Sequence, residues 1–181
     1  MKLKKKSLGQ NFLQDKNICK KILLQSNIYN REILEIGPGS GFLTDSILEN
    51  KPKKLILIEK DYDLFMYLKK KYKNYKNVNI FNMDALKYNF NNKNKINIIS
   101  NLPYNISTRI ILKLFTNSQH IDEMVLMIQK EVGEKFNYNL KKLNKYKFLN
   151  NICANYKVCF DVSPNVFRPK PKVFSSVVKF T

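Results

Sequence analysis

The sequence has few acidic residues for its length. Its 181 residues include 33 Lys and Arg but only 14 Asp and Glu, which gives a formal net charge of +19. A positive field of this size attracts polyanions and releases their counterions on binding, so nucleic acid is the expected partner. The chain is also rich in Lys, Asn, Ile and Tyr, and AT-rich coding drift is an alternative source of part of the charge.

Cysteines and long apolar runs are also scarce. Cys19, Cys153 and Cys159 are odd in number and lack CxxC spacing, so we expect neither a disulfide framework nor a metal site, and a reducing cytoplasm fits. No run of roughly 18 apolar residues is present, so no membrane span is expected. The basic start, residues 1–6, lacks the apolar core of a secretory signal; a very short organellar transit peptide is the weaker alternative.

Apolar strands alternate with helical patterns along most of the chain, which indicates an α/β fold with a parallel sheet. Towards the end, two strands follow each other with no helix between them, so they should pair antiparallel. We predict a Rossmann-like, mostly parallel seven-stranded sheet with a C-terminal antiparallel hairpin, in a single domain over residues 1–181. The predicted helices are 15–26, 42–49, 62–72 and 106–115, and the predicted strands are 31–36, 54–58, 78–81, 96–100, 123–128, 155–162 and 173–180.

A glycine-rich turn and two acids predict a nucleoside cofactor site. Gly37-Pro38-Gly39-Ser40-Gly41 joins a strand to a helix, where glycines let the backbone approach a ligand closely. Glu59 ends the next strand, where an acid can accept hydrogen bonds from ribose hydroxyls, and Asp84 follows the third strand, within reach of an adenine amino group. Bare turns and helix caps are the alternative interpretation of these residues. The spacing leaves both NAD and S-adenosylmethionine open, although Phe42 after the last glycine departs from the dinucleotide pattern.

Asn101-Leu102-Pro103-Tyr104 directly follows the fourth strand, at the edge where open α/β sheets bind ligands. The lone pair of an adenine amino group is delocalised into the ring, so the group is a poor nucleophile. The Asn101 side-chain oxygen and the Leu102 carbonyl can hold its two N–H bonds and favour a pyramidal nitrogen. Pro103 fixes the backbone and Tyr104 offers a ring on which the base can stack. A plain turn is the alternative for this tetrapeptide.

Three segments resemble the rRNA adenine dimethyltransferase family, which dimethylates two adjacent adenosines of small-subunit rRNA. They are Asn-Leu-Pro-Tyr-Asn-Ile-Ser at 101–107, Gly-Gln-Asn-Phe-Leu at 9–13 and Phe-Arg-Pro-Lys-Pro-Lys-Val at 167–173, and Gln-Lys-Glu-Val at 129–132 also matches. The resemblance runs from Gly9 to Lys179. It implies an S-adenosylmethionine-dependent enzyme that acts on small-subunit rRNA or on the pre-ribosomal small subunit, and we expect a monomer.

The resemblance also implies roles for single residues. Asn11 and Leu13 would close over the cofactor, Gly37 would underlie its methionine end, and Asn101 would contact both cofactor and target base. Phe167 would stack on the target adenine opposite Tyr104, with core packing between the last two strands as the alternative. Three cations, Arg168, Lys170 and Lys172, would contact phosphates, unless they are ordinary solvated loop charges.

The chain departs from the family in two places. The family continues into a small helical C-terminal domain, whereas this sequence ends at Thr181, either as a fragment or because the domain has been lost. In addition, Tyr-Lys-Phe-Leu-Asn at 146–150 replaces a Tyr-Gly-x-Leu-Ser-like stretch. The alternative functions are the related large-subunit rRNA methyltransferases that confer macrolide resistance and a non-catalytic RNA-binding assembly factor. A NAD-dependent oxidoreductase lacks any identifiable hydride-transfer residue. The number of methyl groups added, and a bacterial or an organellar origin, stay open.

Overall fold

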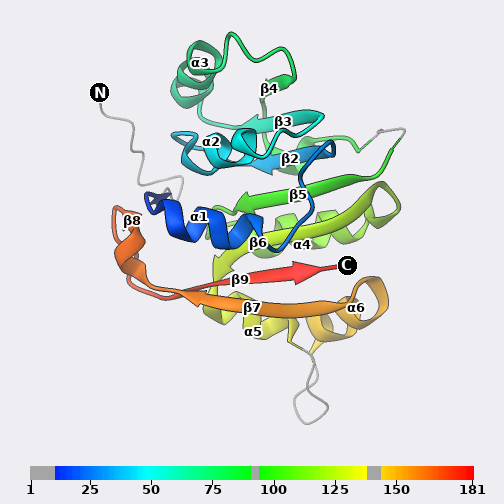
Figure 1. The fold of residues 1–181 in the computed structure, drawn as a ribbon. Helices are drawn as coiled ribbons and strands as arrows, with labels where there is room; N and C mark the ends of the chain where they lie inside the picture. The colour runs from blue at the N-terminus through cyan, green and yellow to red at the C-terminus, as the bar shows by residue number, and fades with distance from the viewer. Residues whose placement is uncertain (1–10, 91–93, 138–143) are drawn as a thin grey trace.

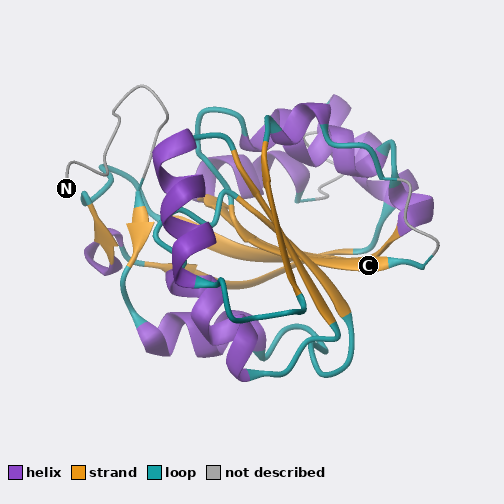
Figure 2. Cartoon of the chain, turned by 90° about the horizontal axis from the view of Figure 1, so that it is seen from above, coloured by secondary structure: helices purple, strands orange, loops and turns teal. Residues whose placement is uncertain are grey.

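The described residues, 11–90, 94–137 and 144–181 of a computed structural model, form a twisted sheet with helices on both faces (Figure 1, Figure 2). Its seven strands lie in the order β4-β3-β2-β5-β6-β9-β7, and every strand except β9 runs in the same direction. These strands are β2 (Glu32–Ile36), β3 (Lys54–Glu59), β4 (Val78–Asn82), β5 (Ile96–Asn101), β6 (Ile121–Gln129), β7 (Tyr156–Val162) and β9 (Ser175–Phe180). The predicted α/β fold and seven-stranded, mostly parallel sheet are therefore confirmed.

The helices divide between two hydrophobic cores, one on each face of the sheet. On one face pack α1 (Lys16–Leu23), α2 (Phe42–Glu49) and α3 (Tyr62–Lys71). On the other face pack α4 (Ser107–Phe115), α5 (Lys130–Phe136) and α6 (Lys145–Cys153), and the short helices are η2 (Ala85–Lys87), η3 (Ser118–His120) and η5 (Pro164–Val166). The strands between the cores are apolar on both sides, as a covered parallel sheet requires.

The end of the chain folds differently from a simple terminal hairpin. The predicted antiparallel pairing of the last two long strands is confirmed, from Tyr156↔Phe180 to Val162↔Ser175. However, β9 also pairs antiparallel with β6 and so lies inside the sheet, which leaves β7 at the edge (Figure 1). Alternation identifies a strand but not its neighbours, so the sequence pattern could not reveal this insertion.

Helices α5 and α6, the short helices η2, η3 and η5, and two strands were not predicted. Helices α5 and α6 are short, and the two-residue strands β1 (Phe12–Leu13) and β8 (Phe167–Arg168) exist because segments from the two ends of the chain pair antiparallel. Such pairing is a tertiary property that local periodicity does not encode. No helix in the described ranges is long and apolar enough to cross a membrane.

Candidate functional site

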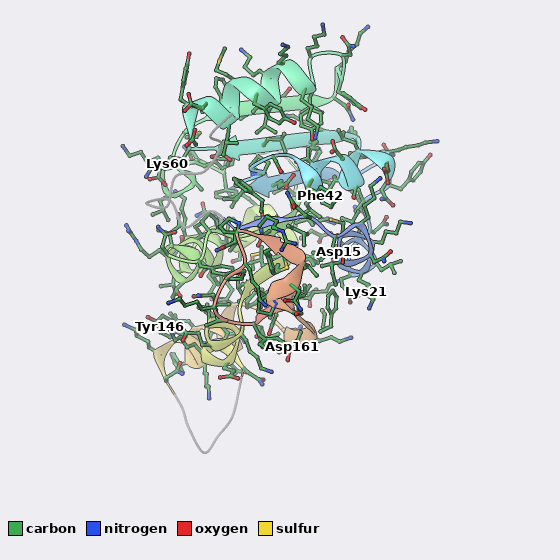
Figure 3. All side chains as sticks on the ribbon, turned by 90° about the vertical axis from the view of Figure 1, so that its left-hand side faces the viewer. Asp15, Lys21, Phe42, Lys60, Tyr146 and Asp161 are labelled. Atoms are coloured by element: carbon green, nitrogen blue, oxygen red, sulfur yellow. The ribbon has the colours of Figure 1, made fainter. Side chains whose placement is uncertain are left out.

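A cavity opens at the carboxyl ends of the parallel strands, where the strand order reverses between β2 and β5. This reversal is the place at which open α/β sheets bind ligands. The glycine-rich turn follows β2, and Gly37, Gly39 and Gly41 have φ of +68°, +59° and +78°. These left-handed conformations strain other residues, so the glycines let the turn fold into the mouth of the cavity. Figure 3 faces this edge of the molecule, with Phe42 and Lys60 labelled beside it.

The N-terminal segment closes over the turn. A side chain added at Gly39 would meet the Phe12 ring at 2.7 Å, so the ring lies directly against the glycine. The neighbouring Leu13 is buried, lines the cavity and pairs with Phe167 across β1 and β8. The backbone carbonyl of Asn11 accepts a hydrogen bond from Asn101 Nδ2 at 3.2 Å. The structure thus brings Asn11, Leu13, Gly37 and Asn101 together around one cavity; Gly9 and Gln10 of the same motif lie outside the described residues.

The two predicted acids both line the cavity, in different surroundings. Glu59 is buried and accepts hydrogen bonds from the backbone N–H groups of Gly39 (3.1 Å) and Asp61 (2.9 Å). Burial raises the pKa of the Glu59 carboxyl, and the two backbone hydrogen bonds act in the opposite direction by lowering it. Asp84 caps η2 through the N–H of Leu86 and pairs with Lys60 at 2.9 Å. The Lys60 contact lowers the pKa of Asp84, so this acid carries its charge at the cavity rim.

Asn101 presents an unused acceptor. Its Nδ2 is taken by the Asn11 carbonyl, whereas its Oδ1 is buried and has no hydrogen-bond partner among the described residues. Leaving a buried acceptor unpaired costs about 1–3 kcal/mol. Because Asn101 lines the cavity, a bound N–H donor would remove this cost.

Tyr104 is held in place from two sides. Its hydroxyl lies 2.5 Å from Ser175 Oγ at the start of β9, and its ring meets Phe167 edge-on at 6.5 Å between centroids. Burial raises the pKa of the Tyr104 hydroxyl, which the Ser175 hydrogen bond opposes. Phe167 is 0% exposed, belongs to the core beneath α1–α3 and does not line the cavity. In this structure the ring therefore backs Tyr104 and presents no free face to a base.

Pro103 and Leu102 also line the cavity. A side chain added at Gly37 would lie 3.4 Å from Pro103 Cγ, so the two predicted motifs touch. Leu102 is buried, and its N–H donates to the Met127 carbonyl of β6.

Sequence reasoning missed two residues that shape this site. Glu35, the acid inside the apolar strand β2, is buried, lines the cavity and accepts a 2.7 Å hydrogen bond from Thr44 Oγ1. Burial raises the pKa of Glu35 to about 8. Ser100 Oγ accepts from the Ile36 N–H (2.6 Å) and donates to the Ile36 carbonyl (3.2 Å), which ties the end of β2 to the end of β5. Each of them is a polar residue within an otherwise apolar strand, and this is the sequence signal that could have identified both.

Comparison with known proteins places this site in a family. The family model for ribosomal RNA adenine dimethylase matches residues 1–181. The chain belongs to this family. It is 43% identical to the Ribosomal RNA small subunit methyltransferase A of Pelagibacter ubique over 184 residues, covering 98% of this chain and 70% of that protein. The protein of the same name from Mesomycoplasma hyopneumoniae is also 43% identical, with 97% of this chain and 68% of that protein covered.

Solved structures agree on the fold. A dimethyladenosine transferase from Plasmodium falciparum superposes with a TM-score of 0.83 at 30% identity, over 93% of this chain and 62% of that one. The 23S rRNA methyltransferase ErmE gives the same TM-score at 23% identity, over 94% and 69% of the two chains. The chain thus spans about two thirds of the length of these relatives, and the Rossmann-like methyltransferase fold is shared throughout that part.

Proposed function

We propose that this chain is an S-adenosylmethionine-dependent enzyme that methylates the exocyclic N6 of adjacent adenosines in small-subunit rRNA, as part of subunit maturation. The observation that carries the proposal is the unpaired Asn101 Oδ1, a buried acceptor in a cavity that also holds a nucleoside-type glycine turn. Its supports are the family model and relatives at about 43% identity that carry the small-subunit name.

The cavity fits the cofactor. The turn at Gly37–Gly41 offers close backbone approach, Glu59 and Asp84 place carboxylates at the ends of neighbouring strands, and Leu13 supplies an apolar wall. When bound, S-adenosylmethionine supplies an electrophilic methyl group. In our proposal Glu59 holds ribose hydroxyls, Asp84 contacts the adenine, Asn11 and Leu13 cover the cofactor, and Gly37 underlies its methionine end.

The Glu59 carboxylate already accepts two backbone N–H groups, so Ala at this position would also release the turn. Glu59→Gln is the sharper test, since it keeps one acceptor and removes the charge. It should weaken cofactor binding by on the order of 1–3 kcal/mol, the loss expected for charged hydrogen bonds. Calorimetry that gives wild-type affinity in the folded variant would remove Glu59 from the site.

The target base lies, in our proposal, between Tyr104 and Asn101. Asn101 Oδ1 and the Leu102 carbonyl accept the two amino N–H bonds and direct the nitrogen lone pair at the methyl group, while Pro103 keeps this backbone rigid. Tyr104 stacks on the base, and Phe167 acts by fixing the Tyr104 ring from within the core. No strong base is required, because methyl transfer to the amine leaves it acidic, and catalysis is largely positioning.

The large-subunit alternative is not favoured, because the relatives above 40% identity carry the small-subunit name and ErmE, at 23%, shares the fold alone. A non-catalytic assembly role has no need for the unpaired acceptor at Asn101. We further propose that the enzyme works as a monomer in the cytoplasm, and that residues 1–181 form one methyltransferase domain.

Incubation with labelled S-adenosylmethionine and each isolated ribosomal subunit, followed by mass spectrometry of the rRNA, tests the function. We expect methylated adenosine in the small-subunit rRNA and none in the large-subunit rRNA. Methylation of the large subunit would favour the alternative enzyme, and RNA binding without methylation would favour an assembly factor.

A further inference from the structure

The segment from Arg168, the last residue of β8, to Phe174, just before β9, is a loop whose two ends are fixed to residues that line the cavity. At its start, Phe12↔Arg168 and Leu13↔Phe167 pair across β1 and β8. At its end, Ser175 Oγ bonds to the Tyr104 hydroxyl. Both Leu13 and Tyr104 line the cavity, so the two ends of this loop contact residues of the cavity lining.

The loop carries exposed apolar side chains close to one of these ends. Phe174 is 55% exposed, whereas Phe167 at the other end of the loop is fully buried. The adjacent Val173 is exposed as well. The Phe174 carbonyl accepts a 3.0 Å hydrogen bond from the N–H of Lys130, so the backbone that bears the ring is anchored. An exposed, anchored aromatic ring beside a cavity is a surface on which another flat group can stack.

The positive charges of the loop indicate which kind of molecule it binds. Arg168, Lys170 and Lys172 are exposed, and none of them has a carboxylate partner within the part of the chain that the structure describes. Unpaired cations around an exposed ring match a single-stranded nucleic acid, which offers phosphates and unstacked bases together.

We propose that Phe174 is a stacking platform for an unpaired nucleobase next to the target adenosine, with the loop cations on the flanking phosphates. Ser175 directs its side chain at Tyr104, and successive side chains of an extended chain point to opposite sides, so Phe174 faces away from the Tyr104 ring. The base on Phe174 is therefore a different base from the one that Tyr104 receives, and in our proposal it is a nucleotide flanking the target. This inference rests on the proposed function, because it takes the target base to lie at Tyr104.

The test uses the full chain and a small-subunit rRNA hairpin with two adjacent adenosines in its loop. 2-Aminopurine replaces each nucleotide flanking the adenosines in turn, and binding is followed by its fluorescence and by anisotropy, without methyl transfer. Phe174→Ala should weaken RNA binding on the order of 5- to 150-fold, the loss of one stacked base, and abolish quenching at one flanking position. Cofactor affinity and the rate at saturating RNA should stay at wild-type values.

Two substitutions control for other roles. Phe174→Tyr should restore binding and quenching, whereas Phe174→Leu should not, because stacking needs a ring. Phe148→Ala removes another exposed phenylalanine, on α6, and should change nothing. Wild-type affinity in Phe174→Ala, or full rescue by Leu, would overturn the proposal. Phe174-dependent binding by a chain that methylates no rRNA would instead overturn the proposed function and leave the stacking site in place.

Discussion

At the scale of single residues, Asn101 has its two side-chain polar atoms in different states. Nδ2 is held by the Asn11 carbonyl, and Oδ1 is buried without a partner in the described structure. In the proposed mechanism, an acceptor fixed in this way before the substrate arrives would act chiefly on the transition state, in which the amine nitrogen becomes pyramidal.

Asn101→Ala should therefore lower the methylation rate on the order of a hundredfold or more, as the loss of one preorganised polar group does. RNA affinity, carried by many Lys and Arg side chains, should change little. Single-turnover rates with saturating cofactor and RNA, beside anisotropy for RNA binding, separate the two effects. A wild-type rate would place the chemistry elsewhere, and equal losses of rate and affinity would indicate a docking role.

Glu35 predicts a pH-dependent stability. Its pKa is raised by burial from an ordinary value of 4.5 to about 8, next to Asp45, Glu59 and Lys71. Between these two values the folded chain binds more protons than the unfolded chain, so the contribution of Glu35 to the free energy of unfolding falls as the pH rises from about 4.5 to about 8.

Glu35→Gln keeps an acceptor for Thr44 and cannot ionise. Relative to wild type it should gain stability as the pH rises through this window, up to a few kcal/mol at about pH 8. Urea unfolding of both proteins at pH 5 and pH 8 measures the difference. A difference that is the same at both pH values would show that Glu35 titrates near its ordinary pKa in the folded chain.

At the scale of elements, the cavity depends on the contact between β1 and the glycine turn. Gly39→Ala combines a φ of +59° with a methyl group 2.7 Å from the Phe12 ring. The strain amounts to about 1–2 kcal/mol before the contact is counted, and Phe12 must move away. We expect a clear loss of S-adenosylmethionine affinity in calorimetry, partly recovered by adding Phe12→Leu.

Gly133→Ala is the matched control. Gly133 lies inside α5, outside the cavity lining, and has no positive φ. It should leave cofactor affinity unchanged, although its nearest new neighbour is the Tyr156 hydroxyl at 3.2 Å. Equal affinity losses in both variants would assign the effect to general destabilisation.

The elements also show where sequence reasoning succeeds. Helix α2 was predicted at 42–49 and ends there, and Gly37, Glu59, Asp84 and Asn101 each follow or end a strand, so parallel pairing alone brings them to one edge. The pairing of β1 with β8 could not be predicted, because it depends on which distant segments meet. The burial of Phe167 agrees with core packing, which was only the alternative interpretation of this residue.

At the scale of the whole molecule, a net charge of +19 should dominate RNA binding. The logarithm of the affinity should fall linearly with the logarithm of salt concentration, and a footprint of six phosphates would cost on the order of a thousandfold between about 50 and 200 mM. Since phosphate contacts carry little sequence information, unrelated RNAs should compete well. Anisotropy titrations over a salt series test this, and salt-independent affinity would contradict it.

The position of β9 bears on how the protein is made. Ser175–Phe180 lies between β6 and β7, and its first residue holds Tyr104. During synthesis the earlier elements emerge first and can begin to fold. Strands β6 and β7 cannot take their final places until β9, which pairs with both of them, has been made. The edge of the sheet that carries Tyr104 is therefore completed only when residues 175–180 have been translated, and we expect the nascent chain to lack the support that Ser175 gives to Tyr104 until nearly all of this domain has been made.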